Sequence, residues 1–349
     1  MKYKISVILP TNRKNSKEQL DIIHKVADTV NEYESNDSIT FDNDFTNLTA
    51  TYAKDCTHIL KPTLLSLVNQ SMNWLDYEII LCHRYPEDME EAIKCFETRM
   101  NIKLIKEPPS IWHELGNNYT TVNNIRNSGI INAEGELLIF LDDLSIFNHH
   151  LLQDIWEAYK DGYLSTAKAI RRIRWEEKPE YSKGLSKETL INGNIRGAIN
   201  FTNVPIGTTI STAATWTYCT SAPLDEVLDI NGFDEIYDGS FGGTDQDFGR
   251  RLAKVTKYRR KIVGMIYEFA SLPRGSIRIR NDEILREICN QSPNPVHVGA
   301  NTWKPTKRDL KRYENYHKNT IGELDPNWNK LMDVPLIDLK EERKKIGKI

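Results

Sequence analysis

The sequence has few cysteines and no arrangement of them that indicates a structural role. Its 349 residues contain five, scattered along the chain without a CxxC pair or a zinc-ligand spacing: Cys56, Cys82, Cys95, Cys219 and Cys289. Disulfide scaffolds are dense in cysteine, and zinc modules keep their ligands at short fixed spacings, so both classes are excluded. We expect free thiols, as a reducing compartment allows.

Long apolar runs and a strong net charge are also missing. The apolar run before Pro10 is too short for a signal-peptide core, and no segment reaches the length that spans a bilayer. We therefore expect a cytoplasmic protein without a transmembrane segment. The net charge of −3 gives no global basic field, so nucleic acid is not the expected partner, although a local patch stays open.

What is present is the composition of a soluble globular protein, with 39% hydrophobic and 27% charged residues. In the first half, short apolar runs alternate with segments of helical spacing: "KISVIL", "LKPTLLSLVNQS", "DYEIILC", "VNNIRNSGIINA" and "ELLIFL". This alternation predicts a parallel sheet with helices on both faces and ligand sites beyond the carboxyl ends of the strands. Pro10 and Asp142 follow two such strands, and Gly135 is expected to form a turn.

The second half has a different pattern. A helix is predicted over "HHLLQDIWEAYKDG", with Gly162 past its end, and another over "DQDFGRRLAKV". The composition of residues 163–223 is typical of mixed strands and loops. The composition of the C-terminal segment is typical of a loop followed by a charged helical extension. The polar stretch near 31–58 is expected to be an insertion, and the basic run 250–261 a solvated face.

Two clusters of carboxylates could carry chemistry. In "GELLIFLDDLSIF" a strand runs into Asp142 and Asp143, which repel each other unless a cation or hydrogen-bond donors compensate. A divalent ion shared with a diphosphate is one interpretation, and a turn or helix cap is the other. In "SFGGTDQDFGRRL" Asp245 is either a functional carboxylate or a helix cap, and the glycines before it would let a sugar approach the backbone.

The order of "ISVILPTNR", "NNIRNSGIINAEGELLIFLDDL" and "NGFDEIYDGSFGGTDQDFGRRL" resembles the nucleotide-sugar-dependent glycosyltransferases of the GT-A fold, family 2-like, with a galactosyltransferase-like GGxDxD motif. The resemblance spans about residues 4–255. It implies an α/β fold with a Rossmann-like, mostly parallel central sheet flanked by helices. The glycosyltransferase domain would cover residues 1–270, and residues 271–349 would form a loop and helical extension packing on the active site.

The resemblance also implies a donor site. The residues that it assigns to the nucleotide sugar are Pro10, Thr11, Asn12, Arg13, His83, Arg126, Asp142 and Asp143. Arg126 would bind phosphate or a carboxylate of the acid motif. The alternative interpretation of Arg126 is that it forms a surface ion pair. His83 or Arg84 would stand in for the acidic motif that the family has after its second strand.

The metal site departs from the family pattern. The family has Asp-Xaa-Asp, with the last Asp on the metal, whereas Leu144 takes that place here. Mn²⁺ or Mg²⁺ would then be held by Asp142 and Asp143, completed by a residue from elsewhere. His297 is the candidate, because related enzymes add a histidine from a C-terminal loop; its alternative is a polar surface residue.

Inverting members of the family carry "GGEDxDLxxRL" at the second cluster, and there the Asp after Glu is the catalytic base. This implies Asp245 as the base, with Gly243, Thr244 and Asp247 around the acceptor. Trp216 could stack on a sugar face of the acceptor, and core packing is its alternative role. We expect an inverting hexosyltransferase that moves a sugar from a nucleoside diphosphate sugar, a UDP-sugar first, to a hydroxyl of a glycan or other acceptor.

Two alternatives remain open. A sugar nucleotidyltransferase shares the strand–helix alternation, but it would have a glycine-rich basic loop after the first strand, and "PTNRKNSKEQ" has no glycine. The second alternative is a degenerate transferase that only binds nucleotide sugars. It is favoured by two departures from the family motifs, Leu144 and Thr244.

Overall fold

The computed structural model describes residues 1–11, 17, 20, 58–94, 96, 100–110, 121–143, 145–171, 205–213, 215, 219–235, 238, 244–268 and 337–349. The expected insertion, apart from His58, and most of the C-terminal loop therefore lie outside the described residues. Across the described helices, none is long and apolar enough to cross a membrane.

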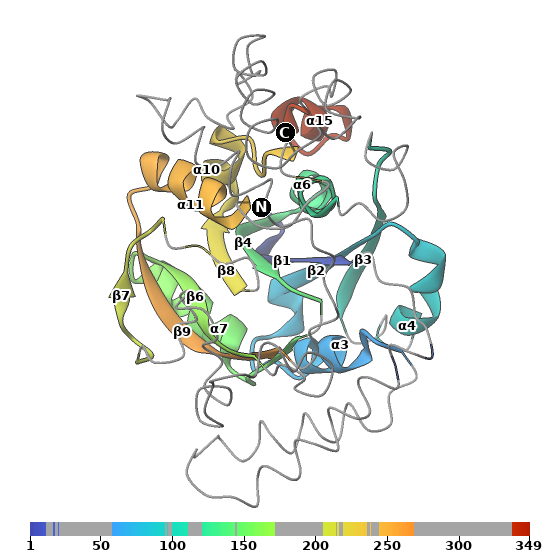
Figure 1. Ribbon diagram of the computed structural model, residues 1–349, viewed down its shortest axis with the longest axis horizontal. Coiled ribbons are helices and arrows are strands. Elements are labelled where there is room, and N and C mark those ends of the chain that lie inside the picture. The colour runs from blue at the N-terminus through green and yellow to red at the C-terminus, as the bar shows by residue number, and fades with distance from the viewer. Residues whose placement is uncertain are drawn as a thin grey trace, which may run out of the picture.

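The described residues form a central sheet of nine strands (Figure 1), with the order β3-β2-β1-β4-β8-β6-β9-β5 and with β7 paired to β9. The first four strands in that order are parallel, and they are β3 (Asn101–Lys106), β2 (Tyr77–His83), β1 (Tyr3–Thr11) and β4 (Gly135–Leu141). Because β1 and β4 are parallel neighbours, Thr11 and the acid pair after Leu141 lie at the same edge of the sheet.

The rest of the sheet is mixed. Its strands are β5 (Ser145–Phe147), β6 (Tyr163–Arg171), β7 (Thr209–Ile210), β8 (Cys219–Pro223) and β9 (Arg259–Glu268). β8 is antiparallel to β4 and β6, β9 is parallel to β6, and β5 and β7 are antiparallel to β9. The predicted α/β fold with a helix-flanked sheet is confirmed. Four neighbouring strands form a parallel part, and in the rest of the sheet the pairings are antiparallel apart from that of β6 with β9.

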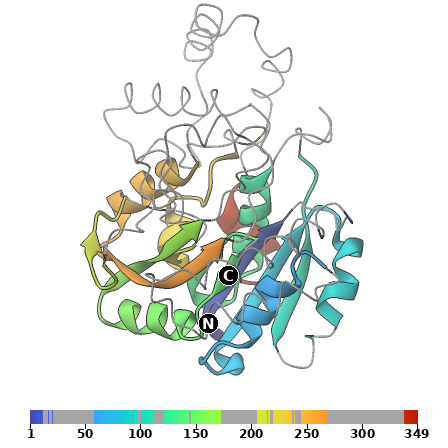
Figure 2. The same cartoon turned by 60° about the horizontal axis from the view of Figure 1, so that its bottom comes forward.

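Successive strand residues point to opposite faces and give two apolar layers. One layer contains Val7, Ile79 and Ile139 and is covered by α3 (Lys61–Val68) and α7 (Leu151–Lys160). The other contains Ile8, Ile80 and Leu138 and is covered by α6 (Val122–Asn132), α10 (Leu224–Asp229), α11 (Thr244–Val255) and α15 (Leu339–Lys345). Figures 1 and 2 show these two sets of helices on the two sides of the sheet, as the alternation in sequence predicts.

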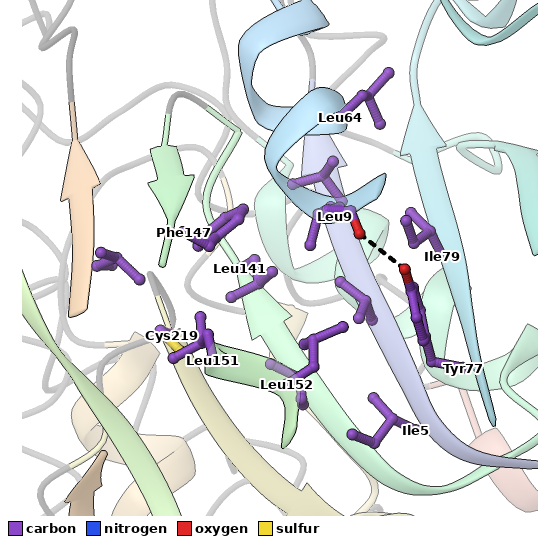
Figure 3. Packing of buried hydrophobic residues seen from close by; sticks show 14 of the residues in the cluster. Ile5, Leu9, Leu64, Tyr77, Ile79, Leu141, Phe147, Leu151, Leu152 and Cys219 are labelled. Atoms are coloured by element: carbon purple, nitrogen blue, oxygen red, sulfur yellow. Dashed lines mark hydrogen bonds between the residues drawn. The ribbon is translucent and has the colours of Figure 1, made fainter. Parts of the chain in front are cut away.

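The first layer shows how a helix is fixed on the sheet (Figure 3). In α3, Pro62 occupies the first turn, where its missing N–H is tolerated, and Leu64 and Leu67 are fully buried. Tyr77, at the start of β2, is buried beside them, and its hydroxyl donates to the Leu67 carbonyl at 2.8 Å. A buried tyrosine thus satisfies its polar atom while its ring joins the core.

Gly135 is not the turn residue that the sequence suggested, because it is the first residue of β4. A Cβ at this position would lie 2.4 Å from the backbone nitrogen of Ser6, so the glycine is required by close contact between β4 and β1. Pro10 does not end β1 either, since the strand continues to Thr11. The β1–β4 register stops at Ile8, so Pro10 is paired only with β2, where a missing N–H can be accommodated.

The described part of the C-terminal extension contains a helix, as predicted. Arg343 of α15 donates through Nη1 to the carbonyls of Ile130, Ile131 and Ala133, at the C-terminal end of α6. A cation there satisfies the last carbonyls of the helix and complements its dipole. That residues 271–349 pack on an active site stays a prediction, because 269–336 are outside the described residues.

The expectation of a solvated face for the basic run 250–261 is wrong for two of its residues. Arg251 and Arg260 are almost completely buried. Arg260 donates through Nη1 to the Ser165 carbonyl at 2.7 Å and the Thr220 hydroxyl at 2.5 Å. Burial lowers the pKa of Arg260 to about 9, so these acceptors are needed to keep a cation in the sheet layer.

Candidate functional site

The acid pair at the end of β4 is fixed by two threonines. Thr11 donates through its hydroxyl to Oδ2 of Asp143 at 2.8 Å, and Thr63 donates to the Asp143 main-chain carbonyl at 2.9 Å. Thr11 and Asp143 are both buried. Because β1 and α3 hold Asp143 in this way, its neighbour Asp142 is presented in a defined position, with its side chain 29% exposed.

Arg126 brings the two acidic clusters together. Its Nη2 lies 3.6 Å from Oδ1 of Asp142, and its Nη1 lies 3.7 Å from Oδ1 of Asp245. The arginine side chain is only 6% exposed, whereas both carboxylates are 29% exposed. The structure therefore places Asp142, Asp245 and Arg126 in one site with its carboxylates open to solvent, and Arg126 has the carboxylate contact that the sequence suggested.

Among the described residues, carboxylates outnumber cations in this site. Asp142 and Asp245 both lie beside the guanidinium of Arg126, and Asp143 follows Asp142 in the chain. A diphosphate would add more negative charge, so electrostatics favour a further cation when such a ligand binds. Oxygen ligands of this kind suit Mg²⁺ or Mn²⁺, which take only one or two carboxylates when phosphate oxygens complete the sphere.

The described residues supply only part of a metal site. Within the described ranges, no group of three or more His, Cys, Asp or Glu side chains is close enough together to hold a metal ion. Asp142 and Asp143 fit as two of the ligands, although Oδ2 of Asp143 already accepts from Thr11. His297 and Leu144, on which the metal prediction also depends, lie outside the described residues.

The first turn of α11 carries the other predicted residues. Thr244 is buried and accepts from Nδ2 of Asn123 at 3.2 Å, and the main-chain carbonyl of Asp245 accepts from the Thr215 hydroxyl at 2.5 Å. These hydrogen bonds fix the start of α11. The carboxylate of Asp245 lies beside Arg126. Asp245 is thus more than a helix-dipole partner, because it faces a cation from another element.

Asp247 has different surroundings. It is buried, and its Oδ2 accepts from Arg251 at 2.8 Å, while Arg251 also donates to the carbonyls of Ile230 and Gly232. This ion pair ties α11 to the turn after α10. A part for Asp247 in acceptor binding stays a prediction, and this buried contact gives it no support.

His83 and Pro10 lie at the same edge of the sheet as Asp143, at the ends of β2 and β1. His83 is buried, and its Nδ1 accepts from the Tyr85 backbone N–H at 2.6 Å, so it stabilises the turn after β2. Donor binding by either residue stays a prediction. Four further predicted site residues lie outside the part of the chain that the structure describes: Asn12, Arg13, Trp216 and Gly243.

The sequence reasoning missed a polar cluster on α6. The backbone N–H groups of Asn123 and Asn124 donate to the two carboxylate oxygens of Asp238, at 2.8 and 3.0 Å, so a residue distant in sequence caps the helix. Nδ2 of Asn124 donates to Oε1 of Glu107 and Nδ2 of Asn127 to Oε1 of Glu235. Asparagine is unfavourable inside helices, so three of them in "NNIRN" were the available signal of tertiary contacts.

These partner acids titrate unusually. Burial raises the pKa of both Glu107 and Glu235 to about 7. Hydrogen bonds from neighbouring side chains lower these pKa values, but by less than burial raises them. Burial also raises the pKa of Asp238, and the neighbouring charges of Glu235 and Glu107 add to the effect. The helix that carries Arg126 therefore rests on carboxyl groups whose pKa values are raised by burial.

Comparisons with known proteins identify no family. No family model matches the chain, and no curated protein matches it. Among solved structures it is similar to S. aureus TarS: for TarS 1-349 in complex with UDP the identity is 14%, with 91% of this chain and 73% of that chain covered and a TM-score of 0.48. For TarS 1-349 in complex with UDP-GlcNAc the identity is 13%, with 94% of this chain and 79% of that chain covered and a TM-score of 0.47. For a further crystal structure of S. aureus TarS the identity is 14%, with 97% of this chain and 49% of that chain covered and a TM-score of 0.48. At these levels the similarity assigns neither a family nor an activity to this chain.

Proposed function

We propose that this protein is a glycosyltransferase that moves a sugar from a nucleoside diphosphate sugar, a UDP-sugar first, to a hydroxyl acceptor with inversion. The observation that carries the proposal is the position of Arg126 between Asp142 and Asp245. Glycosyl transfer needs a carboxylate that removes a proton from the acceptor and positive charge beside the departing diphosphate. Asp245, whose side chain is 29% exposed, would be this carboxylate, and the guanidinium of Arg126 beside it would be the positive charge.

In this proposal Asp245 accepts the proton of the acceptor hydroxyl as its oxygen attacks the anomeric carbon. The bond between that carbon and the diphosphate oxygen breaks, and the leaving diphosphate keeps the electron pair. General-base assistance of this kind is typically worth about 10²- to 10⁴-fold in rate. Asp245 is exposed enough for an acceptor to reach it, and Thr215 holds its main chain in place.

On the donor side, Arg126 provides a fixed positive charge and a planar array of donors for phosphate oxygens. Asp142, with Asp143 behind it, would hold a divalent cation, and such a cation supplies further stabilisation of the leaving diphosphate when bound. The hydrogen bond from Thr11 keeps Asp143 oriented toward this edge of the sheet. The acceptor class stays open.

The first experiment is a thermal-shift panel of nucleotide sugars with and without Mn²⁺, followed by measurement of nucleoside diphosphate release with a set of glycan acceptors. A bound donor raises the Tm, because a ligand that binds only the folded state stabilises it. Asp245→Asn should lower turnover by about 10²- to 10⁴-fold and leave the donor-induced shift in Tm unchanged. Asp229→Asn is the matched control, because Asp229 is exposed and forms a surface ion pair with Lys340.

The same assays separate the alternatives. Release of pyrophosphate from a nucleoside triphosphate and a sugar phosphate would identify a nucleotidyltransferase. Donor binding without turnover by the wild-type protein would identify a binding module. For a transferase, the anomeric configuration of the product, measured by NMR, must be opposite to that of the donor; retention would contradict a base role for Asp245.

A further inference from the structure

The ring of Phe233 lies against the guanidinium of Arg126. The carbon Cζ of Arg126 is 5.1 Å from the centre of this ring, within the range of a cation–π interaction. Phe233 is also stacked on Phe248 of α11, with ring centres 4.2 Å apart and planes 10° apart. Phe248 follows Asp245 by one helical turn, so one aromatic ring contacts both Arg126 and the helix that carries the proposed base.

The main chain of Phe233 is held by a single side chain of α6. Asn127 accepts the Phe233 backbone N–H at 2.9 Å through Oδ1 and donates to the Phe233 carbonyl at 2.8 Å through Nδ2. A Cβ on Gly232 would lie 2.6 Å from that Oδ1, and Gly232 has a φ of +63°. Glycine is thus needed for the chain to approach Asn127 so closely.

The two ion pairs that join Arg126 to Asp142 and Asp245 are long. Both N–O distances, 3.6 and 3.7 Å, exceed the values of about 2.7–2.9 Å that are usual for charged hydrogen bonds. Ion pairs of this length attract the guanidinium without fixing its plane. The buried ring of Phe233, 5.1 Å from Cζ, occupies space into which the guanidinium would otherwise turn.

We propose that Phe233, locked to α6 by Asn127, is a positioning residue that holds the guanidinium of Arg126 between Asp142 and Asp245. The consequence for catalysis depends on the proposed transferase function, but the positional claim does not. Phe233 touches no reacting atom in this scheme. It acts through Arg126 and, by way of Phe248, through the first turns of α11.

The kinetic test compares Phe233→Leu with Phe140→Leu. Phe140 is a matched control, because it is equally buried and its ring packs edge-on against Phe233 and Phe248 from β4. Both variants should lower Tm to a similar extent. Phe233→Leu should lower kcat/KM by about 3- to 30-fold, the size of a cation–π interaction, while Phe140→Leu stays within about threefold of wild type.

A double-variant cycle adds a measurement that a purely structural role would leave unchanged. In the Arg126→Gln background, Phe233→Leu should cause no further loss of kcat/KM, although it still lowers Tm. An equal loss in the two backgrounds would overturn the proposal. So would equal losses of kcat/KM in Phe233→Leu and Phe140→Leu.

A second readout is independent of enzymatic activity. In protein labelled with ¹⁵N-arginine, an aromatic ring beside the guanidinium shifts the Nε–H resonance of Arg126, assigned with Arg126→Lys. Phe233→Leu should move this resonance by more than Phe140→Leu does; an unmoved resonance would refute the positional claim. If no nucleotide sugar supports turnover, the proposed function fails while this measurement still decides the role of Phe233.

Discussion

The guanidinium of Arg126 lies 3.7 Å from the carboxylate of Asp245, and the two residues come from different helices on the same side of the sheet. Arg126 is on α6, which packs on β1 and β2, whereas Asp245 is in the first turn of α11, which packs against α10. This ion pair connects two helices that are far apart in the chain. It also places the proposed base within reach of the group that would bind the donor phosphates.

Arg126→Gln should weaken donor binding and turnover together. Loss of one preorganised donor to developing negative charge typically costs about 10²- to 10³-fold in kcat. Lysine keeps the charge but not the planar donor array, so Arg126→Lys should recover only part of the activity. Steady-state kinetics with the best donor will check this, with Arg259→Gln as the control because Arg259 is an exposed arginine of β9. Full activity of Arg126→Gln would contradict a donor-side role.

Asp142 and Asp143 should differ in their response to metal. Asp142→Asn removes the more exposed carboxylate and should raise the Mn²⁺ concentration needed for half-maximal activity by about tenfold or more. Asp143→Asn keeps an oxygen that can accept from Thr11, so it should preserve Tm and alter metal affinity less.

The metal titration, followed by activity and by Tm, compares both variants with the wild-type protein after treatment with EDTA. Activity that is unaffected by EDTA would argue that Arg126 alone provides the positive charge. A larger loss of metal affinity in Asp143→Asn than in Asp142→Asn would reverse the assignment of the two ligands.

Glu107→Gln should make the pH dependence of stability shallower. The pKa of Glu107 is raised from 4.5 to about 7 in the folded protein, chiefly by burial. Below pH 4.5 the carboxyl is protonated in both the folded and the unfolded state, and it carries no penalty. Between pH 4.5 and 7 the unfolded chain releases its proton first, so this group lowers the free energy of unfolding as pH rises.

Glutamine resembles the protonated acid, so the variant should match wild type near pH 4.5 and exceed it by about 1–3 kcal/mol at pH 8. Urea unfolding at several pH values will measure this difference. Glu87→Gln, at an exposed position nearby, should show no such trend. A difference that is constant with pH would mean that Glu107 is ionised in the folded protein.

Arg343→Met should destabilise the fold without touching the site. Methionine keeps an apolar stem but removes the donor to three carbonyls at the end of α6, and unsatisfied buried acceptors cost about 1–3 kcal/mol each. We expect a loss of about 2–4 kcal/mol in the free energy of unfolding. Lys345→Met, on an exposed part of the same helix, should change it by less than about 0.5 kcal/mol.

The order of the first strands and helices could be predicted because each carries a local signal. The buried strands β1, β2 and β4 are continuous apolar runs, and α7 has an apolar side and ends before Gly162, whose φ is +86°. The antiparallel strand β8 could not be predicted in the same way, because residues 163–223 are rich in Thr and Ser, and pairing there depends on distant partners. Nor could β9, because its first residues belong to the basic run 250–261, which was expected to be a solvated face. Gly135 was misassigned because its contact is with a distant partner, Ser6.

The sequence by itself determined which residues could do chemistry, because an acid pair after a buried strand and a carboxylate at a helix start are local patterns. Only the tertiary structure decided that Asp142 and Asp245 face the same arginine, and that Phe233, Asn127 and Asp238 support the helix that carries it. Such contacts join segments far apart in the chain. Their distances follow from how the sheet orders its strands and how the helices pack on it, which no single segment encodes.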